Sequence, residues 1–115
     1  MLSKKFRFHR QNHVRKVYRI GQSARTKHIG LKYLEQRDPT ENRVAVVVSK
    51  KIDKKAVTRN RIRRRMYEII RRDWSETKQG YDLVFTVYDN VLATENHEKL
   101  EKEVKELLGK AKLLN

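Results

Sequence analysis

The first apolar pattern in the chain has helical spacing and lies within residues 10–20. Val14, Val17 and Tyr18 fall on one face of a helix in this segment, and Gly21 follows at the position of a C-cap glycine. The pattern predicts a short helix with one narrow apolar face, followed by a turn.

Two strand patterns come next. Residues 28–34 alternate apolar with small or polar side chains, which is typical of a half-buried strand. Residues 43–48 are apolar on both faces, which predicts a buried strand in the centre of a sheet. The connection at residues 36–42 is short and polar. We therefore expect these two strands to pair as an antiparallel hairpin.

Between residues 56 and 74 the spacing becomes helical again. Apolar side chains fall within one arc and polar side chains lie opposite, so this helix can pack against a sheet and still present a polar surface. The apolar arc consists of Ile62, Met66, Ile69 and Ile70. The opposite side consists of Asn60, Arg61, Arg64 and Arg71.

The last third of the chain predicts one more strand and one more helix. Residues 81–88 alternate apolar and polar positions, and residues 95–112 carry apolar side chains at helical spacing opposite a face of Glu and Lys. The predicted order is helix, strand, strand, helix, strand, helix, and further short strands are compatible with it. A chain of 115 residues suits a single domain, residues 1–115, with one modest core.

Charge is distributed unevenly and points to a polyanionic partner. The chain carries 29 Lys and Arg against 14 Asp and Glu, a net charge of +15. Residues 1–72 hold 23 of the basic and 5 of the acidic side chains, and residues 49–72 alone hold eleven basic and two acidic ones. Each phosphate that such a surface neutralises releases condensed counterions, so binding to a nucleic acid should weaken steeply with salt.

The Arg-rich helix also has a plain interpretation, because basic runs on helices are often only solubilising surface. Here acids are almost absent from the run, so the i,i+4 ion pairs that accompany a solvated helix are not available. Repulsion among the cations destabilises the free helix and is relieved when phosphates neutralise them. We therefore predict nucleic-acid contact through this cluster. It comprises Arg59, Arg61, Arg63, Arg64 and Arg65, with Asn60 able to contact a backbone or base edge.

Catalysis by the chain itself is not indicated. The four glycines are isolated, so there is no phosphate-binding loop, and no nucleophile elbow or paired-carboxylate motif occurs. His9 and His13 are four residues apart and could touch one zinc ion on a helix, but no cysteine or third histidine nearby completes a ligand set. The carboxylates of the last helix are assigned to its solvated face. They are Glu98, Glu101, Glu103 and Glu106.

The expected compartment follows from three sequence features. The chain has no cysteine, and no apolar run approaches the roughly 20 residues that span a bilayer. Its amino-terminal segment is basic and lacks the hydrophobic centre of a secretory signal. We expect a soluble, cytoplasmic protein that makes no contact with a membrane.

Residues 56–64, with the sequence AVTRNRIRR, closely resemble the signature of the bacterial ribonuclease P protein subunit. In that family an Arg-Asn-Arg helix is preceded by a Ser-Lys-Lys turn at the end of a buried strand, as in residues 48–51 here. The resemblance runs over nearly the whole chain. It includes the basic amino terminus, the short helix ending at Gly21, the Tyr81-Asp82 strand start and the terminal amphipathic helix.

The resemblance implies a fold as well. The family has an α/β (α+β) two-layer sandwich like the second domain of ribosomal protein S5, with three helices and a four-stranded, mostly antiparallel sheet. It also has a left-handed βαβ crossover that contains the Arg-rich helix, although crossover connections generally favour the right-handed form.

By the same resemblance, the RNA subunit is the catalyst and the protein, with no catalytic residue, assists removal of the 5′ leader from precursor tRNA. Mg²⁺ would sit on the RNA, with none bound tightly by the protein, and one protein monomer would bind each RNA. The positions that match contacts to the RNA subunit are Lys50, Lys51, Arg59, Asn60, Arg61, Arg63 and Arg64. The positions that match the leader cleft, between the first helix and the sheet, are Arg7, Phe8, Val14, Tyr18 and Lys32.

Some positions depart from the family pattern. The family often has aromatic residues where this chain has Val14 and Lys32, which removes stacking of about 1 to 3 kcal/mol per base. It commonly has an Arg-Pro pair where this chain has Tyr88-Asp89. Tyr18 and Val14 are also compatible with ordinary packing between helix and sheet.

Two other classes of protein share part of this pattern. A ribosomal or general RNA-chaperone protein would have the same charge but would bind many RNAs without promoting cleavage. A protein-only nuclease would need an acidic cluster that binds metal, and the only acids in the basic run are Asp53 and Glu68, which are too far apart to form a pair.

Overall fold

The computed structural model describes residues 11–37 and 41–115, except for the side chains of residues 11–13. Its main elements are α1 (Gln11–Ile20), β1 (Gln22–Arg25), β2 (Ile29–Glu35), β3 (Arg43–Val47), α2 (Ala56–Arg72), β4 (Tyr81–Val87) and α3 (His97–Lys110). A short 3-10 helix, η2 (Trp74–Glu76), precedes β4, and another, η3 (Asn90–Ala93), follows it. The predicted helices and strands are confirmed, and β1 is an additional short strand.

The strands form one sheet in the order β1-β2-β4-β3. The β1–β2 and β2–β4 pairs are antiparallel, and the β3–β4 pair is parallel. The expected α+β class and the mostly antiparallel sheet are therefore confirmed. Because α2 connects the parallel strands β3 and β4, the chain also contains the βαβ unit that the resemblance implies. The left hand of that crossover stays a prediction.

The predicted hairpin between residues 28–34 and 43–48 is wrong. In the structure β4 lies between these two strands, and Phe85 of β4 is opposite Leu31 of β2 on one side and Val46 of β3 on the other. The reason is that β4 is buried continuously from residue 82 to residue 85, so it needs neighbours along both edges. A short connection between two strands does not prevent a later strand from pairing with both of them.

The prediction of a central position for the second strand is also wrong, because β3 lies at an edge of the sheet. Its interior residues are buried nevertheless, since helices cover both of its faces. Val44 and Val46 belong to the larger core, and Ala45 packs with Val17 of α1 and Val84 of β4 in a smaller one. A strand that is apolar on both faces is thus one whose two faces are both covered by helices. The pattern does not show whether the strand is central or at an edge of the sheet.

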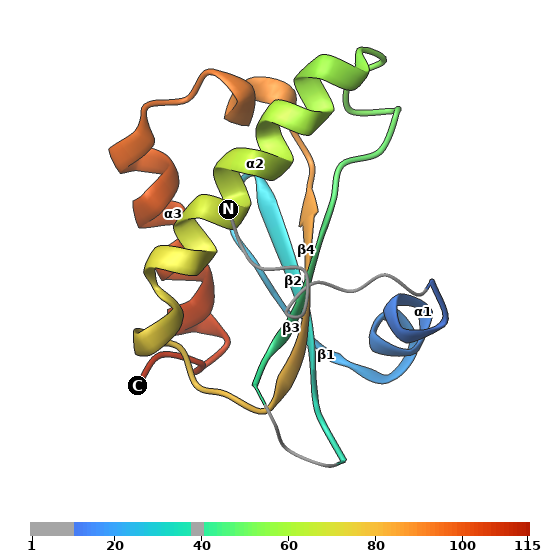
Figure 1. Ribbon diagram of the computed structural model, residues 1–115, viewed down its shortest axis with the longest axis vertical. Helices are drawn as coiled ribbons and strands as arrows, with labels where there is room; N and C mark the ends of the chain where they lie inside the picture. Colours follow the sequence, from blue (N-terminus) through green and yellow to red (C-terminus); the bar gives the residue numbers. More distant parts are fainter. Residues whose placement is uncertain (1–10, 38–40) are drawn as a thin grey trace.

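The helices lie on opposite sides of the sheet. Helices α2 and α3 cover one face, and α1 lies against the other (Figure 1). The larger core lies between the sheet and the α2–α3 layer, with Phe85 fully buried near its centre. Its residues from α2 are the predicted arc Ile62, Met66, Ile69 and Ile70, together with Tyr67. Its residues from α3 are Leu100, Val104, Leu107 and Leu108.

One carboxylate of α3 departs from the solvated face predicted for all four. Glu103 Oε2 accepts hydrogen bonds from Thr26 Oγ1 at 2.7 Å and from the His28 backbone N–H at 2.9 Å, and its Oε1 lies 2.8 Å from His28 Nδ1. Burial opposes ionisation of Glu103, but the hydrogen bonds from His28 and Thr26 outweigh it and lower the pKa of this carboxyl. Glu103 therefore joins α3 to the β1–β2 turn.

Helix α3 ends in an unusual turn. The Lys112 N–H donates to Gly109 O at 3.0 Å and the Leu113 N–H donates to Leu108 O at 2.9 Å, which is the pattern of a Schellman motif. Lys112 occupies its left-handed position with a φ of 60°. Glycine is usual there, because an L side chain in this conformation costs about 1–2 kcal/mol. The chain then returns beside residue 77 and forms a bridge between Thr77 and Leu114.

Candidate nucleic-acid interface

The turn before α2 presents lysines and fixes the start of the helix. Lys50 and Lys51 are exposed in a turn closed by a hydrogen bond from Ile52 N to Ser49 O at 3.0 Å. Asp53 Oδ1 accepts from the Lys55 N–H at 2.8 Å, and this bond holds the pKa of Asp53 below its usual range. The Ser-Lys-Lys turn and the helix start therefore form one ordered basic segment.

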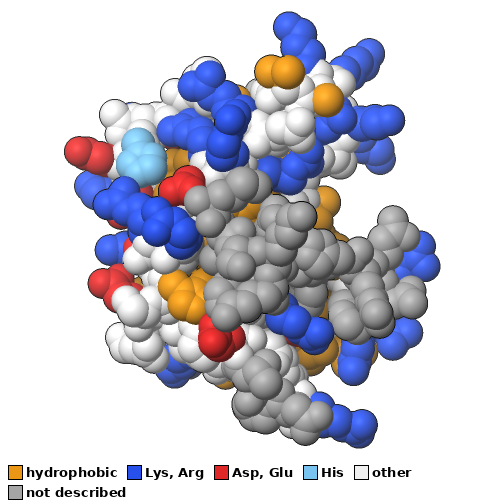
Figure 2. All heavy atoms as spheres, in the orientation of Figure 1, with side chains coloured by type: hydrophobic (Ala, Val, Ile, Leu, Met, Phe, Trp, Pro, Cys, Tyr) orange, Lys and Arg blue, Asp and Glu red, His pale blue; other side chains and the backbone are white. Residues whose placement is uncertain are grey.

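The amino-terminal half of α2 presents two of the predicted arginines directly to solvent. Arg61 and Arg64 are exposed, and no hydrogen bond or ion pair within residues 11–37 and 41–115 engages either guanidinium. Figure 2 shows Lys and Arg side chains gathered around this end of α2, at the top of the view, with few acids among them. These side chains are available to neutralise phosphates.

Two of the predicted contacts also have partners inside the protein. Arg59 Nη1 donates to the carbonyl oxygens of Asp53 and Lys54, both at 2.9 Å, and so holds the loop that leads into the helix. Arg63 donates to Asn60 Oδ1, so the amide of Asn60 is oriented by its neighbour one turn along. Both arginines retain N–H groups for a ligand, because a guanidinium has five.

Arg65 does not belong to the unpaired cluster in which the sequence analysis placed it. Its Nη1 donates to Leu92 O at 2.6 Å and its Nη2 donates to Glu95 O at 2.5 Å. Burial lowers the pKa of this guanidinium. The guanidinium makes these hydrogen bonds because position 65 faces η3 and the turn after it, where backbone carbonyl groups need hydrogen-bond donors. Arg65 therefore connects α2 to the segment that leads into α3.

The carboxyl-terminal half of α2 differs from the amino-terminal half. Arg71 Nη2 pairs with Glu68 Oε2 at 3.1 Å, and Arg72 Nη1 lies 3.9 Å from Glu101 Oε2. Exposed pairs of this kind contribute little to stability, but they reduce the net positive charge locally. The strongest positive field of α2 therefore lies over its first three turns and the lysine turn before them.

A shallow hollow with a mixed apolar and polar lining adjoins this cationic surface. Its volume is about 490 Å³, and it lies between the first turn of α2 and the η3 segment. Val57 is 78% exposed at its rim, Val91 is 36% exposed, and Arg61 lines the same hollow. The surface thus offers apolar contact beside charge, which suits a base or ribose as well as a phosphate.

A second candidate surface lies on the sheet face beside α1. The Tyr18 hydroxyl reaches from α1 to Thr86 Oγ1 of β4 at 2.5 Å, and Tyr18 is 39% exposed, so it is not a core residue. Lys32 is half-buried on the same face. Val14 packs against the smaller core, which agrees with the packing interpretation of that position. Arg7 and Phe8 lie outside the described residues.

Two further residues of this face were not predicted from the sequence, Arg25 and Tyr88. Arg25 Cζ lies 4.3 Å from the centroid of the Tyr88 ring, a cation–π contact, and Tyr88 is 41% exposed. The ring lies over Gly30, where a Cβ would come within 2.9 Å of Tyr88 Cε2. The signal in the sequence was a glycine within a strand pattern, but its partner Arg25 is known only from the strand pairing.

The described residues contain no metal-binding cluster. Within residues 11–37 and 41–115, no three His, Cys, Asp or Glu side chains are grouped so that they could hold a metal ion. His9 and the side chain of His13, the pair considered for zinc, lie outside the described part of the structure. In that same part of the chain, no helix is long and apolar enough to cross a membrane.

The fold and the two surfaces together define a small, basic α+β protein with an exposed cationic helix and a separate aromatic and basic sheet face. Comparison with known proteins gives the family. The family model described as Ribonuclease P matches residues 2–112. The ribonuclease P protein component of a Pseudanabaena species is 38% identical over 115 residues, covering 100% of this chain and 98% of the relative. That of Natranaerobius thermophilus is 39% identical over 100 residues, with coverage of 87% and 84%.

Solved structures agree on the fold. The RNase P protein of Staphylococcus aureus superposes with a TM-score of 0.84 at 20% identity, covering 96% of this chain and 98% of the other. The protein from Thermotoga maritima gives 0.79 at 20% identity, with coverage of 89% and 94%. The chain therefore belongs to the ribonuclease P protein component family. It is part of an endoribonuclease of tRNA processing.

Proposed function

We propose that this chain is the protein subunit that binds the catalytic RNA of ribonuclease P and the 5′ leader of precursor tRNA. In this role it assists the Mg²⁺-dependent removal of the leader that produces the mature tRNA 5′ end. The observation that carries the proposal is the surface formed by the unengaged Arg61 and Arg64 with the lysine turn before them, on a chain of this family. The protein acts in the cytoplasm as a single domain, with one monomer on each RNA.

The RNA subunit is assigned to the amino-terminal half of α2 and the turn before it. Arg61 and Arg64 are exposed on the helix, and Lys50 and Lys51 are exposed in the turn before it, so two adjoining segments supply cations. Phosphate neutralisation removes the repulsion among them and releases counterions. Asn60, Arg59 and Arg63 add directed N–H donors beside these charges. This arrangement supports binding to a folded RNA with closely spaced phosphates.

The leader of precursor tRNA is assigned to the sheet face beside α1. Tyr18 and Tyr88 offer exposed aromatic rings, and Lys32 and Arg25 supply positive charge on the same face. Stacking of a base on an aromatic side chain contributes about 1 to 3 kcal/mol and tolerates any sequence. Val14 and Lys32 offer no aromatic ring for stacking, and Tyr88, held by Arg25, supplies one in their place.

Chemistry is assigned to the RNA subunit, with magnesium held on that RNA. The residues of this chain position the two RNAs: α2 holds the catalytic RNA, and the opposite side of the β-sheet holds the leader. Holding the substrate strand in one place reduces the entropic cost of reaching the reactive geometry. The expected kinetic effect is tighter binding of precursor tRNA and cleavage at a lower magnesium concentration.

A reconstitution assay tests the proposal. Purified protein is mixed with a bacterial ribonuclease P RNA and precursor tRNA at low magnesium, and release of the leader is compared with RNA-only and protein-only reactions. We expect strong stimulation at the mature 5′ end and no cleavage by the protein alone. RNA binding without stimulation would instead identify a general RNA chaperone, and cleavage by protein alone would identify a nuclease.

The leader surface is tested separately with Tyr18→Ala. We expect the dissociation constant for precursor tRNA to rise about tenfold, as loss of one stacked base predicts, with affinity for mature tRNA unchanged. Glu106→Ala is the control, because it truncates an exposed side chain of α3, on the other side of the sheet. An equal change for precursor and mature tRNA would contradict a leader site on this face.

A further inference from the structure

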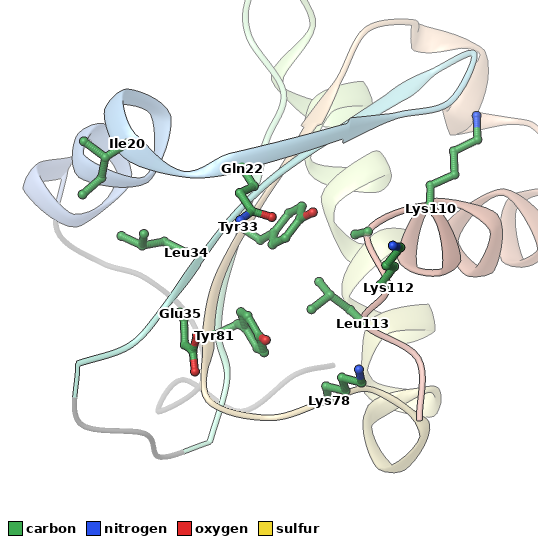
Figure 3. Close-up of a pocket in the computed structure, with 11 residues that line it drawn as sticks. Ile20, Gln22, Tyr33, Leu34, Glu35, Lys78, Tyr81, Lys110, Lys112 and Leu113 are labelled. Atoms are coloured by element: carbon green, nitrogen blue, oxygen red, sulfur yellow. The ribbon is translucent and has the colours of Figure 1, made fainter.

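A cavity of about 590 Å³ lies at the end of the sheet where the carboxyl-terminal segment returns (Figure 3). Its walls come from the end of α1 and the start of β1, from β2, from residue 78 and the start of β4, and from the segment at the end of α3. This volume is in the range of sites that hold a small molecule. The family function assigned above leaves the cavity without a role.

Two tyrosines form one wall of this cavity. The rings of Tyr33 and Tyr81 meet edge to face, with centroids 6.5 Å apart and an interplanar angle of 64°. Both are half-buried against the larger core, and in Figure 3 they project toward the side of the cavity formed by Leu113 and Lys112. No hydrogen bond from another residue of the described chain engages either hydroxyl. The wall therefore offers aromatic surface and two unengaged polar groups.

Lysines stand across from the tyrosines. Lys78 and Lys112 both line the cavity and are exposed, whereas Nζ of Lys110, the third lysine of the lining, donates to Arg25 O at 3.1 Å. Glu35 is the acidic side chain among the lining residues, so the balance is cationic. This excess of positive charge favours a ligand whose anionic group lies beside the lysines.

The backbone holds these two lysines in place. The Lys78 N–H donates to Leu113 O at 2.6 Å, which joins the segment before β4 that carries Lys78 to the turn that carries Lys112. Lys112 itself has a φ of 60°, a conformation that favours glycine. Glycine would fit this turn better, so the turn itself does not require a lysine at this position.

We propose that this cavity binds one nucleotide, with the phosphate on Lys78 and Lys112 and the base against Tyr33 and Tyr81. The same chemistry is present in a free nucleoside monophosphate and in the terminal nucleotide of a 5′-phosphorylated RNA strand. The tyrosines lie on the sheet face covered by α2 and α3, opposite Tyr18 and Tyr88. The tyrosine wall of the site therefore faces away from the leader surface, and its test needs neither the RNA subunit nor precursor tRNA.

The test is an NMR titration of the ¹⁵N-labelled protein with adenosine 5′-monophosphate, adenosine and inorganic phosphate. We expect the amides of residues 78, 81 and 113 to shift most with the monophosphate, which joins both halves of the site. Lys112→Gly should weaken this binding about tenfold, as loss of one charge-assisted contact predicts, while preserving the turn. Lys102→Ala, which removes an exposed lysine of α3 outside the cavity, should leave the affinity unchanged.

A second titration with a 5′-phosphorylated trinucleotide and its unphosphorylated form separates the two sources. Tighter binding of the phosphorylated trinucleotide than of the monophosphate identifies the end of an RNA strand, and the reverse order identifies a free nucleotide. Shifts confined to the α2 surface, or equal loss of affinity in Lys112→Gly and Lys102→Ala, would overturn the proposal. Thermal unfolding of each variant shows that the fold is retained.

Discussion

Replacing Glu103 by alanine is the sharpest test of how the fold is held together, because one carboxylate joins α3 to the β1–β2 turn. The substitution removes three hydrogen bonds, from Thr26 Oγ1 and from the backbone and ring nitrogens of His28. Since a carboxylate only accepts, His28 Nδ1 carries the proton in this arrangement. The side chains of His28 and Glu103 are only 16% and 14% exposed, so water replaces the lost bonds poorly.

The magnitude follows from these contacts. A hydrogen bond to a charged group contributes about 1.5–3 kcal/mol net, and three that share one carboxylate are not additive, so we expect a loss of about 3 kcal/mol. Thr26 keeps a weak bond to Ile29 O at 3.3 Å, which limits the cost at that hydroxyl. With an unfolding entropy of about 2.1 cal/mol/K per residue, the loss corresponds to a Tm about 12 °C lower.

Thermal and urea unfolding of the Glu103→Ala variant measure this change, with Glu106→Ala as the control. Glu106 is an exposed carboxylate on the same helix, so its removal should change stability by less than about 0.5 kcal/mol. Similar Tm values for the two variants would refute the reasoning.

The pH dependence of the same pair gives an independent check. The pKa of Glu103 is lowered by folding, so its contribution is present above the unfolded value of about 4.3 and is lost as the pH falls through the lower folded value. The wild-type protein should therefore lose more stability than Glu103→Ala when the pH is lowered through this range. Equal acid sensitivity of the two proteins would show that the carboxylate is not linked to folding.

Three further predictions concern other sites. Arg61→Ala should weaken binding to ribonuclease P RNA and reduce the slope of log K against log salt by about 1, without loss of stability. Arg65→Met should instead lower the unfolding free energy in urea by about 1–2 kcal/mol, because Leu92 O and Glu95 O lose their donor. The same effects in both variants would contradict the roles assigned to the two arginines. Lys112→Gly should raise the unfolding free energy by about 1 kcal/mol, since glycine adopts a φ of 60° without penalty, and a lower Tm would contradict this. Gly30→Ala should displace the Tyr88 ring and weaken precursor-tRNA binding relative to mature tRNA, and unchanged affinity would remove Tyr88 from the leader surface.

The helices and the strands were predictable because their signals are local. The arc of Ile62, Met66, Ile69 and Ile70 lies in the core as its spacing predicts, and so does the apolar face of α3. The exposure of Arg61 and Arg64 was predictable for the same reason, since a position on a helical wheel is a property of a short segment. The family was accessible from sequence too, because its motif lies in consecutive residues.

Strand pairing was not predictable in the same way. The pattern of residues 43–48 shows burial on both faces, yet the strand is at the edge of the sheet and its parallel partner, β4, begins more than thirty residues later. Periodicity along one strand reports which faces are covered and carries no information about which strand lies beside it.

The positive charges show most clearly the difference between what the sequence determines and what the tertiary structure decides. The sequence determines that the first 72 residues carry most of the positive charge and that apolar arcs lie opposite it. The tertiary structure alone decides which cations remain available, because Arg65 donates to carbonyl groups about thirty residues away while Arg61 and Arg64 project into solvent. It also decides that Arg25, Gly30 and Tyr88 meet on one face. The physical reason is that a backbone carbonyl or a cross-strand neighbour competes for a side chain only after distant segments have been brought together.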